Sequence, residues 1–251
     1  MKRTLFAKQH KLKLVTYCQP DPGYQQHIVL EYLAYRLYNV VTPLSFRVRP
    51  AEVTYRSSDS DKGVTRFGYL IEDIDDVAGR NGRERLAAAS REVAPTQMDA
   101  RAAGRAALFE YMISNLDWDF LAGQQGADCC HNTELLAAPG ASPATARDVV
   151  PVPYDFDMSG LVDAPYAEPP QGIPVDRVTE RYYRGYCVST PVADEVIDEF
   201  ASHHAEMLAL IDGETRLDPG FRAKTDRFME RFFAVLSDPP RKRREIIAHC
   251  R

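Results

Sequence analysis

The sequence predicts an α+β fold in which a small strand-rich unit precedes a larger, mainly helical one. Segments that alternate polar and apolar residues, the pattern of half-buried strands, gather before residue 75. Apolar residues at helical spacing dominate after residue 175. The chain has 251 residues, 45% of them hydrophobic, which is enough for one substantial core or two small lobes that share a cleft.

The first elements are a strand and a helix. Residues 11–17 alternate polar and apolar side chains, which predicts a half-buried strand. A turn at 21–23 then leads into a helix over about 24–39. The spacing of its apolar residues leaves Glu31 and Tyr35 on the flank and predicts this core face: Leu30, Leu33, Ala34, Leu37 and Val41.

A hairpin follows the helix. Residues 46–49 and 52–55 predict strand structure, 57–63 predict a polar turn, and 67–72 predict the returning strand. The composition of 78–95 shifts to Gly, Ala and Arg, which suits a connection or an irregular helix.

An Ala-rich helix is predicted over about 98–113, and it delivers the acidic segment 115–119 at its C-terminal end. Residues 134–136 and 149–152 predict two short strands, and 159–174 are rich in loop-forming residues. The remaining segments have helical periodicity: 178–186, 193–211, 221–236 and 241–249.

Composition excludes several partners. The formal charge is −5 and the isoelectric point is near 5.7, so no overall basic field attracts nucleic acid or an anionic membrane. No apolar stretch approaches the roughly 18 residues that span a bilayer, and the first residues lack a signal-peptide core. We therefore expect no nucleic acid partner and no membrane span, and as given the chain is expected to be soluble.

The five cysteines form no Cys-x-x-Cys pair, so the sequence does not support a closed zinc site. Cys129, Cys130 and His131 offer metal-ligand chemistry, but adjacent side chains point apart, which favours buried thiols or long-range disulfides. Pairing of Cys18, Cys187 or Cys250 with the 129–130 region would imply an oxidising compartment. We expect some disulfide in the complete protein.

Two acidic segments carry the functional signal. Asp155 and Asp157 follow the second short strand, where alternate residues share a side if the strand stays extended. A solvated turn is the alternative, but the apolar neighbours favour a site. Asp117 and Asp119 end a helix, where negative charge is unfavourable without a nearby cation. For Asp119 we favour the alternative of a loop cap that pairs with an Arg.

Arg177, Arg181 and Arg184 recur at helical spacing and could bind phosphate. Because Asp176 and Glu180 are interleaved with them, ion pairs within a helix are the favoured interpretation.

Several motifs occur in a recognisable order: Lys11-Leu12-Lys13-Leu14, Leu30-Glu31-Tyr32-Leu33-Ala34-Tyr35-Arg36-Leu37, Thr42-Pro43, Gly68-Tyr69-Leu70-Ile71-Glu72-Asp73-Ile74-Asp75, Asn115-x-Asp117, Asn132 and Tyr154-Asp155-Phe156-Asp157. In order and spacing they resemble the spore-coat CotH kinase family. The similarity covers about residues 10–160, and the helices beyond carry no matching motif. Members of that family have an atypical protein-kinase-like fold, bind ATP with a divalent metal and phosphorylate protein Ser and Thr.

The resemblance implies a role for each matching residue. Lys13 becomes the phosphate-contacting lysine, with Lys11 the less favoured candidate, and Glu31 becomes its helix partner. The hinge near adenine would comprise residues 72–75, with Glu72 and Asp73 as cofactor-binding residues. Asp117 becomes the catalytic carboxylate. The resemblance assigns three metal-binding residues: Asn132, Asp155 and Asp157.

The fold that the resemblance implies has two lobes. Residues 1–78 would form a small mixed N-lobe, and residues 79–251 a mainly helical C-lobe that carries the catalytic and metal-binding loops. The expected cofactors are ATP and Mg²⁺ or Mn²⁺, and the expected partners are a nucleotide and a protein acceptor.

This sequence departs from the kinase pattern in three places. The gap from Asp117 to Asn132 is long, so the segment at 129–130 must fold back to place Asn132. Asp157 stands where a typical kinase has Gly. Almost nothing precedes Lys11, so the strands and glycine-rich loop that cover the triphosphate are missing. We expect either a start that is truncated relative to the family or a nucleotide that is covered differently.

Two alternative functions stay open at this point. The same fold could transfer AMP instead of phosphate, or the acidic residues could stabilise a catalytically inactive pseudokinase or structural module. The compartment is also open: an extracytoplasmic protein is slightly favoured if a missing N-terminus carries a signal, and a cytoplasmic one otherwise.

Overall fold

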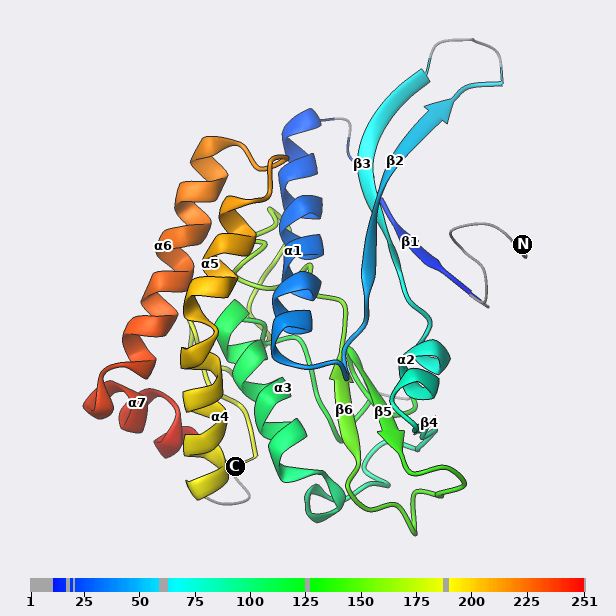
Figure 1. Ribbon diagram of the computed structural model, residues 1–251, viewed down its shortest axis with the longest axis vertical. Helices are drawn as coiled ribbons and strands as arrows, with labels where there is room; N and C mark the ends of the chain where they lie inside the picture. Colours follow the sequence, from blue (N-terminus) through cyan, green and yellow to red (C-terminus); the bar gives the residue numbers. More distant parts are fainter. Residues whose placement is uncertain are drawn as a thin grey trace.

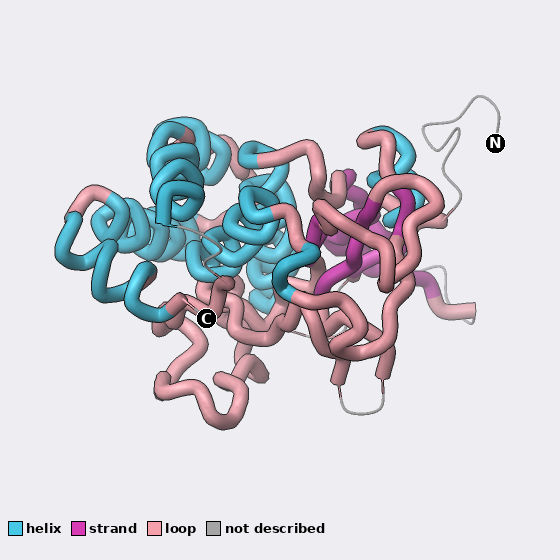
Figure 2. Tube along the Cα trace, turned by 90° about the horizontal axis from the view of Figure 1, so that it is seen from below, coloured by secondary structure: helices cyan, strands magenta, loops and turns pink. Residues whose placement is uncertain are grey.

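The computed structural model describes residues 11–16, 19, 21–58, 63–124, 127–186 and 190–250. Within them the chain is a mixed α+β protein with two three-stranded antiparallel sheets and seven α-helices. Figure 1 shows the larger sheet on one side of helix α1 and the C-terminal helices on the other. Figure 2 shows the same segregation of strands from most helices along a perpendicular view. The α+β class expected from the sequence is therefore confirmed.

The first sheet has the strand order β1-β3-β2 and consists of β1 (Lys13–Val15), β2 (Val48–Arg56) and β3 (Gly63–Ile71). The expected hairpin is present, and its two predicted outgoing strands are one continuous strand, β2. Pro50 is accommodated because β2 is an edge strand. Gly68 lets β1 approach, since a Cβ atom there would lie 2.8 Å from the carbonyl oxygen of Val15.

Helix α1 (Gln25–Val41) lies across this sheet and is buried on two sides. It packs on β3, on α3 (Ala100–Ile113) and on α5 (His204–Asp212). Glu31 and Tyr35, expected on its flank, are therefore buried, with 4% and 2% of their surfaces exposed. A helical periodicity of apolar residues underestimates burial when a helix is covered from more than one direction.

The second sheet has the order β4-β5-β6 and consists of β4 (Glu84–Arg85), β5 (Thr133–Ala137) and β6 (Val150–Pro153). Helix α2 (Ile74–Arg80), which the sequence pattern did not predict, joins the two sheets. Asp73 begins this helix, because its side chain accepts a hydrogen bond from the amide of Asp75 at 3.0 Å.

The C-terminal part contains α4 (Thr190–Ser202), α5, α6 (Pro219–Leu236) and α7 (Pro239–Glu245). The single helix expected over 193–211 is broken at His203 into α4 and α5. The helix expected over 178–186 is absent, and residues 181–186 have no regular structure. No helix in the described parts of the chain is long and apolar enough to cross a membrane.

Candidate active site

The end of α3 positions Asp117. Asp99 caps the start of this helix by accepting the amide hydrogen of Ala102 at 2.7 Å. At its other end Ser114 has a left-handed φ of 54°, which stops the helix and turns the chain. The amide of Asp117 then donates to Oδ1 of Asn115 at 3.1 Å, which closes a short turn. The Asp117 carboxylate stays partly exposed beyond this turn.

Both carboxylate oxygens of Asp117 have hydrogen-bond partners. Nε2 of His131 lies 2.6 Å from Oδ1, and Nδ2 of Asn132 donates to Oδ2 at 3.1 Å. The same Asn132 nitrogen also donates to the main-chain oxygen of Asp117 at 2.7 Å. The structure thus brings Asp117 and Asn132 into direct contact, and adds His131 as a third member.

The long segment between Asp117 and Asn132 folds back, as expected. Asp119 and His131 form an isolated β-bridge in which the Asp119 amide donates to the His131 carbonyl at 3.0 Å. Oδ1 of Asp119 accepts the amide hydrogens of Leu121 and Ala122 at 2.8 and 3.0 Å, which agrees with the loop-capping interpretation. No ion pair of Asp119 with an Arg is present in the parts of the chain that the structure describes.

A disulfide joins Cys129 and Cys130 immediately before His131. The expectation of a disulfide is confirmed, but this bond is between neighbours, so long-range pairing of these two residues was wrong. Cys250 is disulfide-bonded as well, while Cys18 and Cys187 lie outside the described residues.

The second acidic segment leaves β6 with a sharp turn. Asp155 has a positive φ of 65°, so the extended conformation that would put Asp155 and Asp157 on one side is not adopted. The amide of Asp155 donates to the hydroxyl of Tyr35 at 3.0 Å. Phe156 is fully buried with its ring 4.6 Å from that of Tyr35. The turn is thus held on α1 by Phe156 and by the amide of Asp155. Asp155 and Asp157 directly precede and follow Phe156 in the sequence.

The carboxylates of Asp155 and Asp157 are nevertheless electrostatically coupled. Burial raises the pKa of Asp155, and the negative charges of Asp157 and Asp117 raise it further. The positive charge of Lys13 and the neighbouring His131 oppose this rise in the pKa. The pKa of one of the two paired carboxylates is therefore raised, as expected, with burial as the first cause, and four charged groups act on Asp155: Asp157, Lys13, Asp117 and His131.

Lys13 and Glu31 approach the same place from β1 and α1. Burial raises the pKa of Glu31 to about 8, and the charges of Asp157 and Asp155 contribute, while the Tyr69 hydroxyl and Lys13 lower it. No ion pair within 4.0 Å joins Lys13 to Glu31 among the residues described. The expected partnership is therefore an electrostatic coupling at longer range, in which Lys13 lowers a Glu31 pKa that burial raises.

A cavity of about 420 Å³ opens beside Lys13. Tyr154 and Phe46 contribute aromatic surface to it, and Nζ of Lys13 lies 5.7 Å from the centre of the Tyr154 ring. Glu72 and Asp73 line it too, but their carboxylates have structural partners. Glu72 forms an ion pair with Arg80 at 3.0 Å, and Asp73 caps α2. These two residues can offer the cavity their main chain more readily than their charges.

Asp155, Asp157 and Asn132 supply the oxygen atoms that Mg²⁺ prefers. No group of three or more His, Cys, Asp or Glu side chains is arranged to hold a metal ion in the described part of the chain. A metal held by two carboxylates and an amide would need waters or phosphate oxygens as its remaining ligands.

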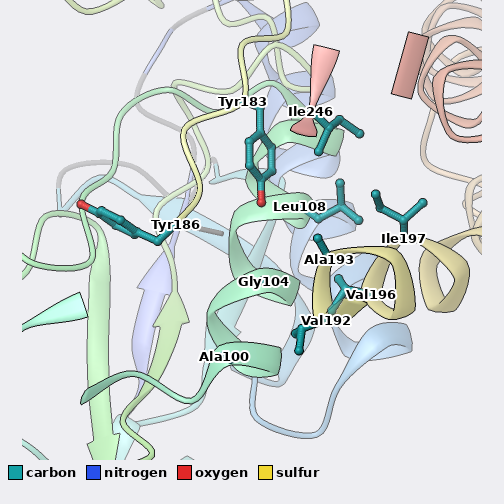
Figure 3. Close-up of a pocket in the computed structure, with 10 residues that line it drawn as sticks. All are labelled: Ala100, Gly104, Leu108, Tyr183, Tyr186, Val192, Ala193, Val196, Ile197 and Ile246. Carbon is teal, nitrogen blue, oxygen red and sulfur yellow. The ribbon is translucent and has the colours of Figure 1, made fainter. Parts of the chain in front are cut away.

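A second cavity lies between α3 and α4, and Figure 3 shows the apolar side chains that surround it. Its volume of about 20 Å³ has room for roughly one water molecule. α4 packs closely on α3 here, and a Cβ atom at Gly104 would be in ordinary van der Waals contact with Cγ2 of Val196, at 3.4 Å. This cavity is a packing feature of the helices and is too small for a nucleotide.

For three residues of the site the sequence did not predict the observed contact. His131 binds Asp117, Tyr35 binds the amide of Asp155, and the Tyr166 hydroxyl donates to Oδ2 of Asp157 at 2.7 Å. The position of His131 next to Asn132 could have indicated that it lies in the site. The position of Tyr35 one helical turn after Glu31 could have indicated that both side chains point the same way. Tyr166 lies in a loop without periodicity, so the sequence carried no signal for it.

In comparisons with known proteins, neither a protein-family model nor a curated protein sequence matched this chain.

Proposed function

We propose that this chain is a phosphotransferase that uses ATP and Mg²⁺ or Mn²⁺ to phosphorylate Ser or Thr hydroxyls of a protein acceptor. The observation that carries the proposal is the convergence of Lys13, Asp117 and Asp155 from three distant parts of the chain. Asp155 is electrostatically coupled to both of the others, and the cavity of about 420 Å³ adjoins Lys13. Phosphoryl transfer needs these groups for positioning and charge neutralisation and needs no covalent nucleophile.

The proposed architecture is a two-lobed, protein-kinase-like fold, with residues 1–78 as a small mixed N-lobe and 79–251 as a mainly helical C-lobe. The position of the cavity supports this division, because residues of β1 and of the β3–α2 connection line it together with residues of β4, of β5 and of the turn after β6. ATP would enter there, with its base against Phe46, Ile71 and Tyr154.

Each charged residue has a task in this proposal. Lys13 neutralises phosphate charge, and Asp117 orients the acceptor hydroxyl and takes its proton. Asn132, Asp155 and Asp157 would hold the divalent metal, which when bound neutralises charge on the phosphates. His131 holds the Asp117 carboxylate through Oδ1, so the acceptor-facing group is fixed before substrate binds.

Transfer of label from ATP to a mixture of protein substrates tests the function. ATP labelled at the γ phosphorus should label a protein in the presence of Mg²⁺ or Mn²⁺, and ATP labelled at the α phosphorus should not. Asp117→Asn is the matched inactive control, because it keeps shape and removes the charge. Labelling from the α position would instead establish adenylyl transfer.

Binding is measured separately, as the shift in thermal unfolding that ATP and metal produce. This measurement should use a chain that includes any upstream segment. If that chain shows neither a metal-dependent shift in thermal unfolding nor labelling, the pseudokinase or structural alternative remains.

A further inference from the structure

Arg184 binds the main chain on both sides of Asp117. Its Nη1 atom donates to the carbonyl oxygen of Leu116 and, at 3.0 Å, to that of Trp118. Arg184 lies 68 residues after Leu116 in the chain. It belongs to the irregular segment 181–186, part of the stretch 178–186 over which a helix was expected. The side chain thus acts across the fold instead of forming ion pairs along a helix.

Asn132 binds the carbonyl that lies between the two bound by Arg184. The carbonyl of Asp117 accepts from Nδ2 of Asn132 at 2.7 Å, while the carbonyls of Leu116 and Trp118 both accept from Arg184. Successive carbonyls therefore have partners from two different parts of the chain. The main chain at Leu116, Asp117 and Trp118 is thus held by both Arg184 and Asn132, and loss of either removes part of that support.

Trp118 packs into the same contact. The Arg184 guanidinium lies 5.2 Å from the centre of the Trp118 ring, and the ring lies 4.1 Å from that of Phe120. The Trp118 side chain is buried, and its Nε1 donates to the carbonyl of Asn115 at 3.1 Å. A guanidinium is suited to this place because it is planar, so it can stack near a ring while it donates in its plane.

We propose that Arg184 is a positioning residue that fixes the main chain around Asp117 and so holds the carboxylate in its working orientation. The expected effect of Arg184 on the rate of phosphoryl transfer rests on the proposed function. Its expected effect on the conformation of the loop around Asp117 does not.

Trp118 makes the loop directly observable, because it is the single tryptophan of the chain. Its emission maximum and its quenching by acrylamide report the packing of the loop without any substrate. Arg184→Met keeps the length of the side chain and removes the donors. Arg184→Lys keeps a charge but offers a compact ammonium in place of the planar group.

Arg181→Met is the matched control. Arg181 lies in the same segment and also donates to main-chain carbonyls, those of Met112 and Phe228, at 2.8 to 3.0 Å. It also lies 3.9 Å over the Phe228 ring. It therefore shares the type of contact with Arg184 but does not touch the residues that flank Asp117.

We expect Arg184→Met to shift Trp118 emission to longer wavelength and to increase acrylamide quenching in a protein that is still folded by circular dichroism. Arg184→Lys should show a smaller change of the same sign, and Arg181→Met should leave both signals unchanged. In the phosphotransfer assay, Arg184→Met should lower kcat by roughly ten- to a hundredfold. KM for ATP should stay unchanged, because the cavity is built from other elements.

Wild-type emission and quenching in folded Arg184→Met would overturn the proposal, as would a fall in kcat no larger than that of Arg181→Met. If Arg184→Met does not fold, the same two measurements on Arg184→Lys decide in the same way. A fluorescence change in a protein for which even the wild type transfers no label would keep the structural role of Arg184 and remove the proposed function.

Discussion

Nε2 of His131 lies 2.6 Å from Oδ1 of Asp117, and these two residues are brought together by a segment that leaves the site and returns. The contact joins a partly exposed imidazole to a partly exposed carboxylate. It gives the proposed catalytic group an orientation that its own backbone does not impose, because a carboxylate on a loop can otherwise rotate.

Replacement of His131 by Ala is therefore expected to lower kcat by roughly tenfold while KM for ATP changes little, since the orientation of Asp117 is lost. His131→Gln should recover part of the loss through its side-chain amide. His203→Ala is the control, because His203 makes a comparable contact with Glu206 at 3.1 Å next to α5. Equal kcat values for His131→Ala and wild type would show that Asp117 needs no such partner.

Lys13 and Lys11 both line the cavity, but Lys13 alone of the two contributes to the pKa values of Glu31 and Asp155. We expect Lys13→Met to abolish most of the thermal shift that ATP and Mg²⁺ produce, and Lys11→Met to preserve it. The reason is that a phosphate-binding lysine must lie next to the metal-binding carboxylates. If Lys11→Met abolished the thermal shift and Lys13→Met preserved it, Lys11 would be the phosphate-binding lysine.

Asp155→Asn should abolish stabilisation by Mg²⁺ or Mn²⁺ and leave the metal-free protein at least as stable as wild type at neutral pH. Burial and repulsion raise the Asp155 pKa, so its stabilising contribution is complete below pH 3.8 and is lost as pH rises through the folded-state pKa. The Asn side chain removes the charge that is unfavourable at neutral pH. Chemical denaturation with and without metal measures both effects.

Asp163→Asn is the control for that experiment, because Asp163 pairs with Lys224 at 2.6 Å on the surface. It should retain metal-dependent stabilisation. If Asp155→Asn instead lowers the stability of the metal-free protein by several kcal/mol, Asp155 is a structural anchor, and the pseudokinase alternative gains.

Glu31 should make the stability of the protein fall as pH rises from about 4.5 to about 8. The folded protein keeps a proton on Glu31 that the unfolded chain releases above pH 4.5, so the stabilising contribution is complete below that pH and lost near pH 8. The slope attributable to one such group is at most about 1.4 kcal/mol per pH unit.

Comparison of wild type with Glu31→Gln isolates this slope, because the amide mimics the neutral acid and does not titrate. The free energy of unfolding should converge for the two proteins at low pH and separate above it, with Glu31→Gln the more stable. Glu195→Gln, at an exposed position of α4, should follow the wild-type profile. Parallel curves for Glu31→Gln and wild type would mean that Glu31 is ionised in the folded protein.

The sequence by itself determined the α+β class, the antiparallel hairpin, helices α1, α3 and α6, and the two acidic segments. These features depend on local patterns: alternation in β3, apolar spacing in α1, and an Ala-rich run in α3. The order of Asp117, Asn132 and Asp155 along the chain was enough to select them as candidate catalytic and metal-binding residues. Their role in phosphoryl transfer stays a prediction.

Only the tertiary structure decided which groups touch and which are buried. Glu31 was assigned to a flank because periodicity on one helix contains no information about the second layer that covers it. Asp155 turns with a positive φ because Tyr35 and Phe156 anchor it on α1, a contact between segments 120 residues apart. Arg184 lies in an irregular segment instead of the expected helix and donates to the carbonyls of Leu116 and Trp118. These main-chain acceptors beyond α3 need donors that only the folded chain brings near.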